Sequence, residues 1–430
     1  MTKNTEKTIG LWGIIFTITG FVVGVSIFIL PAELIDIAGP AVLVAYAIAG
    51  GMAIVTCFAV AQIGTLMPAE GGTFVAISRL ISPFYGFLAV WVLLCAVVMV
   101  NSFIGYGFAN YIVYFIPGLD KTLAAVAIIL LFGLVNIFGS SLVVKVQGVM
   151  VVFFLIMLTV FIVMGIPEFE VKNLTPFMPN GVGSVLMAAT IGYFSFAGFV
   201  SLLEFGGEIK NPTRNIPLGL LGSFIVVIVS YGGVSLILSG IDTGVPFSEM
   251  ETPVLEVAKT FIPEWLMGAL VISIIAAAAT TVNGLILGYS RDILVAAQAG
   301  LFPSFLADKS KRFNTPHNAI IAYTLLSAGT VMIGSGVEQY ALVAVLGLLL
   351  QQLFIAVSLY RVPTVMKDEY EGAEFQLSRI TIKIVSVILF VISAAFIMMH
   401  IFNSPIIGVL IVAVLTTGSL VYYLSNRDKT

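Results

Sequence analysis

The stretch ITGFVVGVSIFILP, from Ile18 to Pro31, places helix-weakening residues inside an apolar segment. Gly20, Gly24 and Ser26 lie in its middle. Glycine lowers helix stability by about 1 kcal/mol relative to alanine, and a bilayer core holds no water to satisfy a loosened backbone. A helix that breaks here exposes N–H groups at the start of its second half and C=O groups at the end of its first half. The first set favours a carboxylate and the second favours a cation.

This break predicts a binding site for a small zwitterion or anion. The backbone N–H groups of Gly24, Val25 and Ser26 would hold a carboxylate. A second glycine-containing segment, TIGYFSFAGFVS at 190–201, would supply carbonyl groups near 195–198 for an ammonium group. The alternative is that the glycines are small-residue contacts that allow close packing of helices.

The elements that carry these segments are long apolar blocks. Of 430 residues, 60% are hydrophobic and only 10% are charged, whereas about a quarter are charged in a typical soluble domain. Each block reaches the roughly 20 residues that cross a hydrocarbon core about 30 Å thick. We therefore predict an all-α polytopic membrane protein that forms a single domain over residues 1–430. Its twelve transmembrane helices are expected approximately at 10–36, 41–66, 84–115, 122–140, 145–166, 183–206, 217–239, 264–297, 318–336, 339–360, 380–402 and 405–424.

The basic residues predict the orientation of these spans. If both termini share one side, that side carries 16 of the 19 Lys and Arg residues, and only Lys121, Lys172 and Lys259 lie opposite. The positive-inside rule then places both termini in the cytoplasm of a cell with the chain in its cytoplasmic membrane. The short polar segment MTKNTEKTIG precedes a full-length span, so we expect this span to be retained and not cleaved as a signal peptide.

Three motifs resemble the amino acid–polyamine–organocation (APC) superfamily of permeases. They are the glycine-rich opening that ends in SIFILP, the segment SFAGFVSLLEFGGEIKNPTRNIPLG at 195–219, and YSRDILVAAQAGLFP at 289–303 followed by NTPHNA. The resemblance covers essentially the whole chain. It implies the leucine-transporter-type fold, in which spans 1–5 and 6–10 form a five-plus-five inverted repeat, here at about 10–166 and 183–360. Two extra spans follow at 380–424, and spans 1 and 6 are broken at the midplane.

The resemblance also implies the positions of substrate-binding residues. Phe194 matches a bulky aromatic residue that closes over the substrate, and Ser195 begins the span-6 wall. Asn101 and Asn283 match polar positions near the substrate, and the alternative for both is a hydrogen bond between helices. The full implied set is Val22, Val23, Gly24, Val25, Ser26, Asn101, Phe194, Ser195, Phe196, Ala197 and Asn283.

Two departures from the family pattern bear on the substrate and the driving ion. Exchangers for arginine carry an acidic residue two positions after the span-6 glycine, where this chain has Val200. The substrate side chain is therefore expected to be neutral and largely apolar. Sodium-independent members place a lysine in span 5 at the position of Phe154. In those members the ammonium group of this lysine occupies the position that sodium takes in the sodium-coupled relatives. This chain has Phe154 instead, so no ammonium group fills that position.

Hard oxygen ligands near the break in span 1 could instead hold a sodium ion, the one cofactor that we predict. The alternative is that the threonine hydroxyl groups bond to the backbone of their own helix. The candidate ligands are Gly20, Val23, Ala277, Thr280 and Thr281.

Two acidic residues near the cytoplasmic end of span 6 are candidates for gating or proton binding. Ionisable groups within a membrane are expensive to bury and are commonly functional. Glu204 and Glu208 are these candidates, and the alternative for Glu204 is a gate-side carboxylate paired with an Arg or Lys.

These observations favour a secondary active transporter that moves a small amino acid by alternating access, coupled to Na+ or H+. An amino acid or amine exchanger is the first alternative, and a transporter-like membrane sensor is the second. We find no phosphate-binding loop, catalytic triad or metal-ligand spacing in the sequence, so we expect neither an enzyme nor a nucleic-acid-binding protein. The expected partners are the substrate and the lipid bilayer, and the sequence leaves the oligomeric state open.

Overall fold

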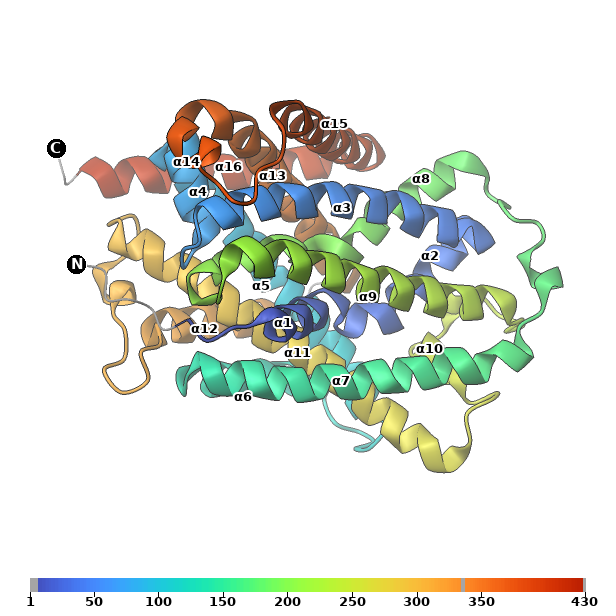
Figure 1. Ribbon diagram of the computed structural model, residues 1–430. Coiled ribbons are helices and arrows are strands. Elements are labelled where there is room, and N and C mark those ends of the chain that lie inside the picture. Colours follow the sequence, from blue (N-terminus) through green and yellow to red (C-terminus); the bar gives the residue numbers. More distant parts are fainter. Residues whose placement is uncertain (1–6, 334–336, 428–430) are drawn as a thin grey trace.

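The computed structural model describes residues 7–333 and 337–427, and every regular element within these ranges is a helix (Figure 1). Nine stretches of the described residues are long and apolar enough to cross a membrane. They are Leu30–Leu66, Pro83–Ile112, Val143–Glu168, Gly181–Glu204, Pro212–Gly240, Glu264–Gln298, Val343–Val365, Arg379–Asn403 and Ile406–Ser425. Three shorter apolar helices, Leu11–Val23, Lys121–Ile137 and His317–Ile333, fall where spans 1, 4 and 9 are predicted.

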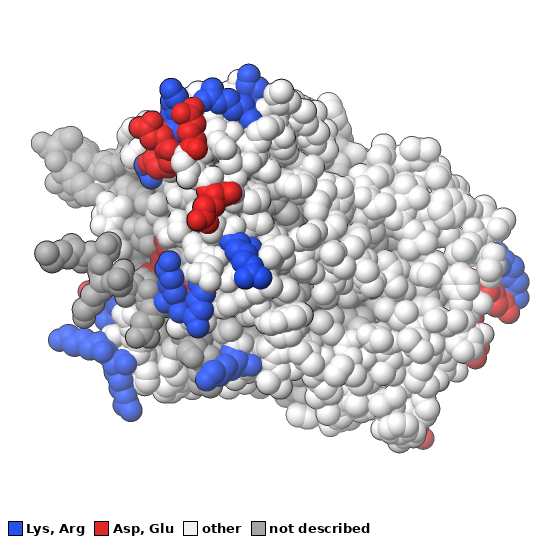
Figure 2. Space-filling view, viewed as in Figure 1, with Lys and Arg blue, Asp and Glu red and all other residues white. Residues whose placement is uncertain are grey.

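The exterior is apolar in the way that a bilayer requires. Large hydrophobic side chains such as Trp265 and Val149 are 80% and 73% exposed, which would be costly in water. Figure 2 shows charged side chains gathered toward the two ends of this face, with a broad uncharged belt between them. The start of α1 and the end of α16 lie toward the same end of the molecule (Figure 1). The protein is therefore a polytopic membrane protein, as predicted.

The first predicted span is divided in two. It comprises α1 (Leu11–Val23), the short 3-10 helix η1 (Val25–Phe28) and α2 (Leu30–Ala38). Helix α1 packs against four elements: α7 (Ser140–Gly165), η5 (Tyr193–Glu204), α9 (Pro212–Gly240) and α11 (Glu264–Gln298). The start of the chain therefore forms part of the centre of the molecule.

Burial separates a central group of helices from a peripheral one. In the apolar stretch of α11 89% of the residues are buried, against 11% for α16 (Ile406–Arg427). Helix α16 contacts α5 (Pro83–Ile112) and α15 (Arg379–Asn403) contacts α13 (Val337–Val365), so both lie outside the central group. The remaining helices are α3 (Val42–Leu66), α4 (Gly72–Leu80), α6 (Lys121–Ile137), α8 (Gly181–Gly192), α10 (Pro253–Ala258), α12 (His317–Ile333) and α14 (Lys367–Glu371).

Candidate functional site

The break in span 1 falls at Gly24, where the sequence predicts it. Gly24 adopts φ 44° and ψ −156°, a backbone conformation that L-residues rarely adopt. A Cβ atom at this position would lie 1.9 Å from the hydroxyl oxygen of Thr281. Only glycine satisfies both constraints, so α1 ends here and passes closely against α11.

Hydroxyl groups brace the broken backbone. The Ser26 hydroxyl donates to the carbonyl of Val23 at 2.9 Å and forms a hydrogen bond of 2.7 Å with the Tyr231 hydroxyl. The hydroxyl of Tyr231, on α9, also lies 3.1 Å from the Val23 carbonyl oxygen, so two hydroxyl hydrogens are shared among these three contacts. The freed carbonyl of Val23 is therefore satisfied by hydroxyl groups of the protein.

Span 6 departs from the prediction of a broken helix. Helix α8 ends at Gly192 and continues as the twelve-residue 3-10 helix η5, without an unwound segment near 195–198. A 3-10 helix still pairs each N–H group within the chain, so the change of winding loosens the helix without exposing a row of backbone groups. Runs longer than three or four residues are uncommon and often mark a functional hinge.

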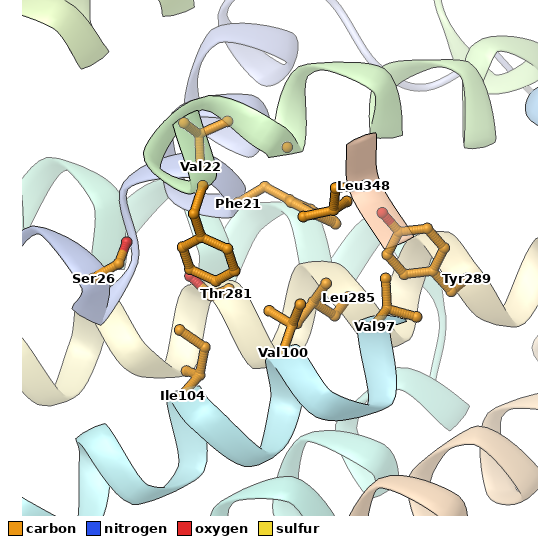
Figure 3. A pocket seen from close by; sticks show the side chains of 12 residues that line it. Phe21, Val22, Ser26, Val97, Val100, Ile104, Thr281, Leu285, Tyr289 and Leu348 are labelled. Atoms are coloured by element: carbon orange, nitrogen blue, oxygen red, sulfur yellow. The ribbon is translucent and has the colours of Figure 1, made fainter. Parts of the chain in front are cut away.

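A small cavity lies between α1, η1, α5, η5, α11 and α13 (Figure 3). Its free volume of about 30 Å³ is room for about one water molecule. Side chains therefore close the space, and an amino acid enters only after they move. The lining residues are Phe21, Val22, Ser26, Val97, Val100, Ile104, Phe194, Gly198, Thr281, Leu285, Tyr289 and Leu348.

The lining is aliphatic and aromatic, with polar atoms in few places. Val97, Val100 and Ile104 project from one face of α5, and Ser26 and Tyr289 lie at opposite ends of the cavity (Figure 3). Apart from Ser26, Thr281 and Tyr289, the described lining side chains carry no polar group, and none carries a carboxylate or an ammonium. Such a cavity accommodates an uncharged apolar side chain.

The structure brings three of the predicted substrate residues to this cavity: Val22, Ser26 and Phe194. The Phe194 ring meets Phe103 of α5 edge to face, with 5.5 Å between centroids. Gly198 of η5 packs closely against Val22 of α1, since a Cβ atom on Gly198 would lie 2.8 Å from Val22 Cγ2. The walls from spans 1 and 6 are therefore in direct contact.

Other described residues predicted in spans 1 and 6 do not line the cavity. Val25 packs against Gly107 of α5, and Val23 and Ser195 are fully buried outside the lining. Phe196 contacts the Tyr46 and Tyr231 rings, at 6.3 and 6.0 Å between centroids. Ala197 belongs to η5, and its side chain lies outside the described residues.

The two predicted asparagines also lie outside the lining. Asn101 donates from Nδ2 to the Tyr323 and Ser327 hydroxyls of α12, at 3.1 and 3.2 Å. Asn283 donates to Gln147 Oε1 at 2.9 Å and accepts from another side-chain amide at 2.8 Å. Both residues therefore make the hydrogen bonds between helices that the sequence offered as the alternative.

Four of the five candidate sodium ligands come together. The Gly20 carbonyl accepts hydrogen bonds from the Thr280 and Thr281 hydroxyls at 3.1 and 3.2 Å. The Thr280 hydroxyl also lies 2.7 Å from the Ala277 carbonyl oxygen, so the two carbonyls share its one hydrogen. The oxygens are of the type that a hard cation prefers, but they satisfy one another, so a cation would bind only after these hydroxyl groups turn. The fifth, Val23, is engaged by Ser26 and Tyr231.

Charged residues close the seam where η5 and the short 3-10 helix η6 (Gly206–Glu208) meet α11. Arg291 donates from Nε and Nη2 to Glu208 Oε1, at 3.0 and 2.6 Å, and both side chains are less than 8% exposed. The Glu208 carbonyl accepts hydrogen bonds from the N–H groups of Thr8 and Ile9. Glu204 is fully buried one turn away and accepts hydrogen bonds from the hydroxyl and N–H groups of Thr73.

Comparison with known proteins decides the family, because residues 9–424 match the amino acid permease family model. The chain belongs to the amino acid permease family. This family is part of the APC superfamily, so the resemblance found in the sequence is confirmed, and the protein is a multi-pass membrane transporter of amino acids.

Bacterial relatives cover about three quarters of the permease. The branched-chain amino acid permease BcaP of Bacillus subtilis is 23% identical over 76% of this chain and 74% of its own length. BcaP of Lactococcus lactis is 26% identical over 79% and 78%. The methylthioribose transporter of B. subtilis is 24% identical over 76% and 75%. Relatives of similar identity therefore carry different solutes.

Sequence reasoning missed several residues that shape the site. Val97, Val100 and Ile104 have helical spacing, but every face of α5 is apolar, so no local signal selects the face that meets the cavity. Tyr231 and Tyr289 lie on distant helices and become part of the site only through packing. Arg291 and Asp292 lie within the quoted YSRD motif, and this motif was the available signal.

Proposed function

We propose that this permease moves a small neutral amino acid with an apolar, branched side chain across the cytoplasmic membrane by alternating access. The observation that carries the proposal is the lining of the cavity, which is aliphatic and aromatic and has no charged side chain among its described residues. A charged substrate side chain would lose its hydration there without gaining a partner. Two BcaP relatives with branched-chain names agree with this choice.

The substrate carboxylate would lie at the break in span 1. Ser26 lines the cavity, and the backbone N–H groups of Gly24, Val25 and Ser26 follow the end of α1. Phe194 would close over the bound amino acid. We propose that the permease has twelve spans with both termini in the cytoplasm, that spans 1–5 and 6–10 form the inverted repeat, and that it acts as a single domain without catalysing a reaction.

A gradient of Na+ or H+ would drive transport. The sodium arrangement would use the oxygens around Gly20, Thr280 and Thr281, after their hydroxyl groups turn toward the ion. An exchanger that needs no ion gradient is the alternative to both. Thermal-shift measurements with the twenty amino acids, with and without sodium, address the solute and the ion together.

Leu285→Ala tests the assignment of the cavity. Leu285 lines the cavity, and each methylene that is missing from an apolar pocket changes discrimination between substrates by roughly tenfold or more. We expect the variant to gain affinity for phenylalanine relative to leucine by about tenfold in competition binding. Leu325→Ala is the matched control, because Leu325 is 60% exposed on α12. An unchanged preference in Leu285→Ala, or stronger binding of arginine than of leucine by the unaltered permease, contradicts the proposed function.

A further inference from the structure

A pair of acidic groups lies in the η5–α11 seam, one helical turn from the cavity. The Glu204 carboxyl group on η5 and the Asp292 carboxyl group on α11 approach each other within hydrogen-bonding reach. Glu204 is fully buried and Asp292 is 2% exposed. Two carboxylates cannot both keep their charge at this separation in a dry site, because desolvation and mutual repulsion both oppose it.

The surroundings supply hydrogen bonds for one negative charge. The hydroxyl and N–H groups of Thr73 donate to Glu204, and they belong to the first turn of α4, whose N-terminal end favours an anion. The N–H group of Phe74 faces Asp292. Among the described residues, however, neither Asp292 oxygen has a partner in hydrogen-bond geometry. A proton on one carboxyl group would let it donate to the other and would satisfy an Asp292 oxygen.

No cation in the described seam is free to neutralise the second charge. The Arg291 guanidinium is bonded to Glu208 and to the Leu287 carbonyl. Tyr289 is the other titratable side chain of α11 that faces the pair. The first turn of α4 carries no acidic residue, and its basic residue, Arg79, lies in the last turn.

We propose that Glu204 and Asp292 form a proton-binding pair that couples proton movement to solute transport, a role that rests on the proposed function. One proton binds to a carboxylate oxygen, and the resulting O–H group donates to the other carboxylate, so the closed seam holds one negative charge. Release of that proton leaves two negative charges on facing helices, and their repulsion separates η5 from α11.

The same two helices connect this pair to the cavity. Tyr289 lines the cavity and forms a hydrogen bond of 3.1 Å with Ser201. Tyr289 precedes Asp292 by three residues and Ser201 precedes Glu204 by three residues, so the two contacts lie one turn apart along one seam. Separation of Glu204 from Asp292 therefore also breaks the hydrogen bond between Tyr289 and Ser201 at the end of the cavity. The binding of the proton and the binding of the solute both stabilise the closed seam.

The test uses the full-length permease in liposomes, with labelled L-leucine as the probe. We expect an acid-outside pH gradient to drive leucine accumulation and a sodium gradient to have no effect. Glu204→Gln and Asp292→Asn should each lose gradient-driven accumulation by about tenfold, within the usual range of coupling between sites, while leucine counterflow without a gradient persists. Asp308→Asn, at an exposed carboxylate beyond α11, should match the unaltered permease. If one of the two variants fails to fold, the other carries the test.

Two further measurements distinguish coupling from a merely structural role. Leucine affinity in detergent should rise by roughly tenfold between about pH 8 and about pH 5.5, and both variants should lose this dependence. Infrared difference spectra of a pH titration need no substrate, and they should show a protonated carboxyl band that each variant removes or shifts.

Each outcome separates the proton pair from the proposed function. Accumulation driven by sodium, full gradient-driven accumulation in Asp292→Asn and Glu204→Gln, or an infrared spectrum without the carboxyl band would overturn the proton pair. Absence of counterflow for every neutral amino acid, with the carboxyl band present, would overturn the proposed function and would leave only proton binding by Glu204 and Asp292 supported.

Discussion

The cavity and the charged seam beside it are built from the same helices but by opposite chemistry. The cavity is lined by aliphatic and aromatic side chains, and its hydroxyl groups are bonded within the protein. One turn further, Glu204, Asp292, Glu208 and Arg291 bury three acidic groups and one basic group. The apolar region is suited to selecting a solute, and the charged region is suited to responding to a proton. Residues of η5 and α11 contribute to both the cavity and the charged region, so a movement of η5 relative to α11 alters both.

The largest expected effect in this comparison is on the cavity side, at Gly24. Gly24→Ala introduces a Cβ atom 1.9 Å from the Thr281 hydroxyl oxygen at a positive φ of 44°. We expect loss of leucine binding and transport, because α1 and α11 must separate. Gly51→Ala is the control, since a Cβ atom there meets nothing within 4 Å. Full leucine transport by Gly24→Ala would show that the break is not part of the site.

The charged seam provides the next largest effect. Arg291→Met leaves Glu208 as a buried carboxylate without its partner, and removal of one member of a buried pair typically costs about 3–5 kcal/mol. We expect a lower unfolding temperature together with leakage through the seam, measured by thermal unfolding and by solute efflux from liposomes.

An exposed ion pair provides the control for Arg291. Arg79→Met removes the basic partner of Glu369 in a pair that is about half exposed, and water readily replaces such a partner. Little change is expected in that variant. If the two variants lose stability equally, burial is not what distinguishes the seam from the surface.

The smallest effect is expected at the brace of the broken helix. Tyr231→Phe removes two hydrogen bonds around Val23 and Ser26, and each bond contributes about 0.5–1.5 kcal/mol. We expect a modest fall in unfolding temperature and weaker leucine binding. Tyr360→Phe, on an exposed ring of α13, should change neither. Stronger leucine binding by Tyr231→Phe would indicate that the brace holds the cavity closed against the substrate.

The break in span 1 was predictable, whereas the faces of most helices were not. Gly24 is identified by local chemistry, because glycine in an apolar helix marks a backbone that must bend. Asn101 and Asn283 were predicted near the substrate, yet both bond to neighbouring helices. The rotation of α5 and α11 about their own axes decides which neighbours these two side chains meet. When a helix is apolar on all sides, no local sequence pattern indicates that rotation. The 3-10 winding of η5 likewise has no local signal.

The sequence by itself determined an all-helical membrane protein of the permease family, a break at Gly24 and an acidic residue at Glu204. These features depend on hydropathy, backbone propensity and motif identity, all of which are local. Only the tertiary structure decided which residues line the cavity, and only it placed Asp292 against Glu204 across 88 residues of chain. The physical reason is that a buried carboxyl group acquires its chemistry from its neighbours, and packing chooses those neighbours.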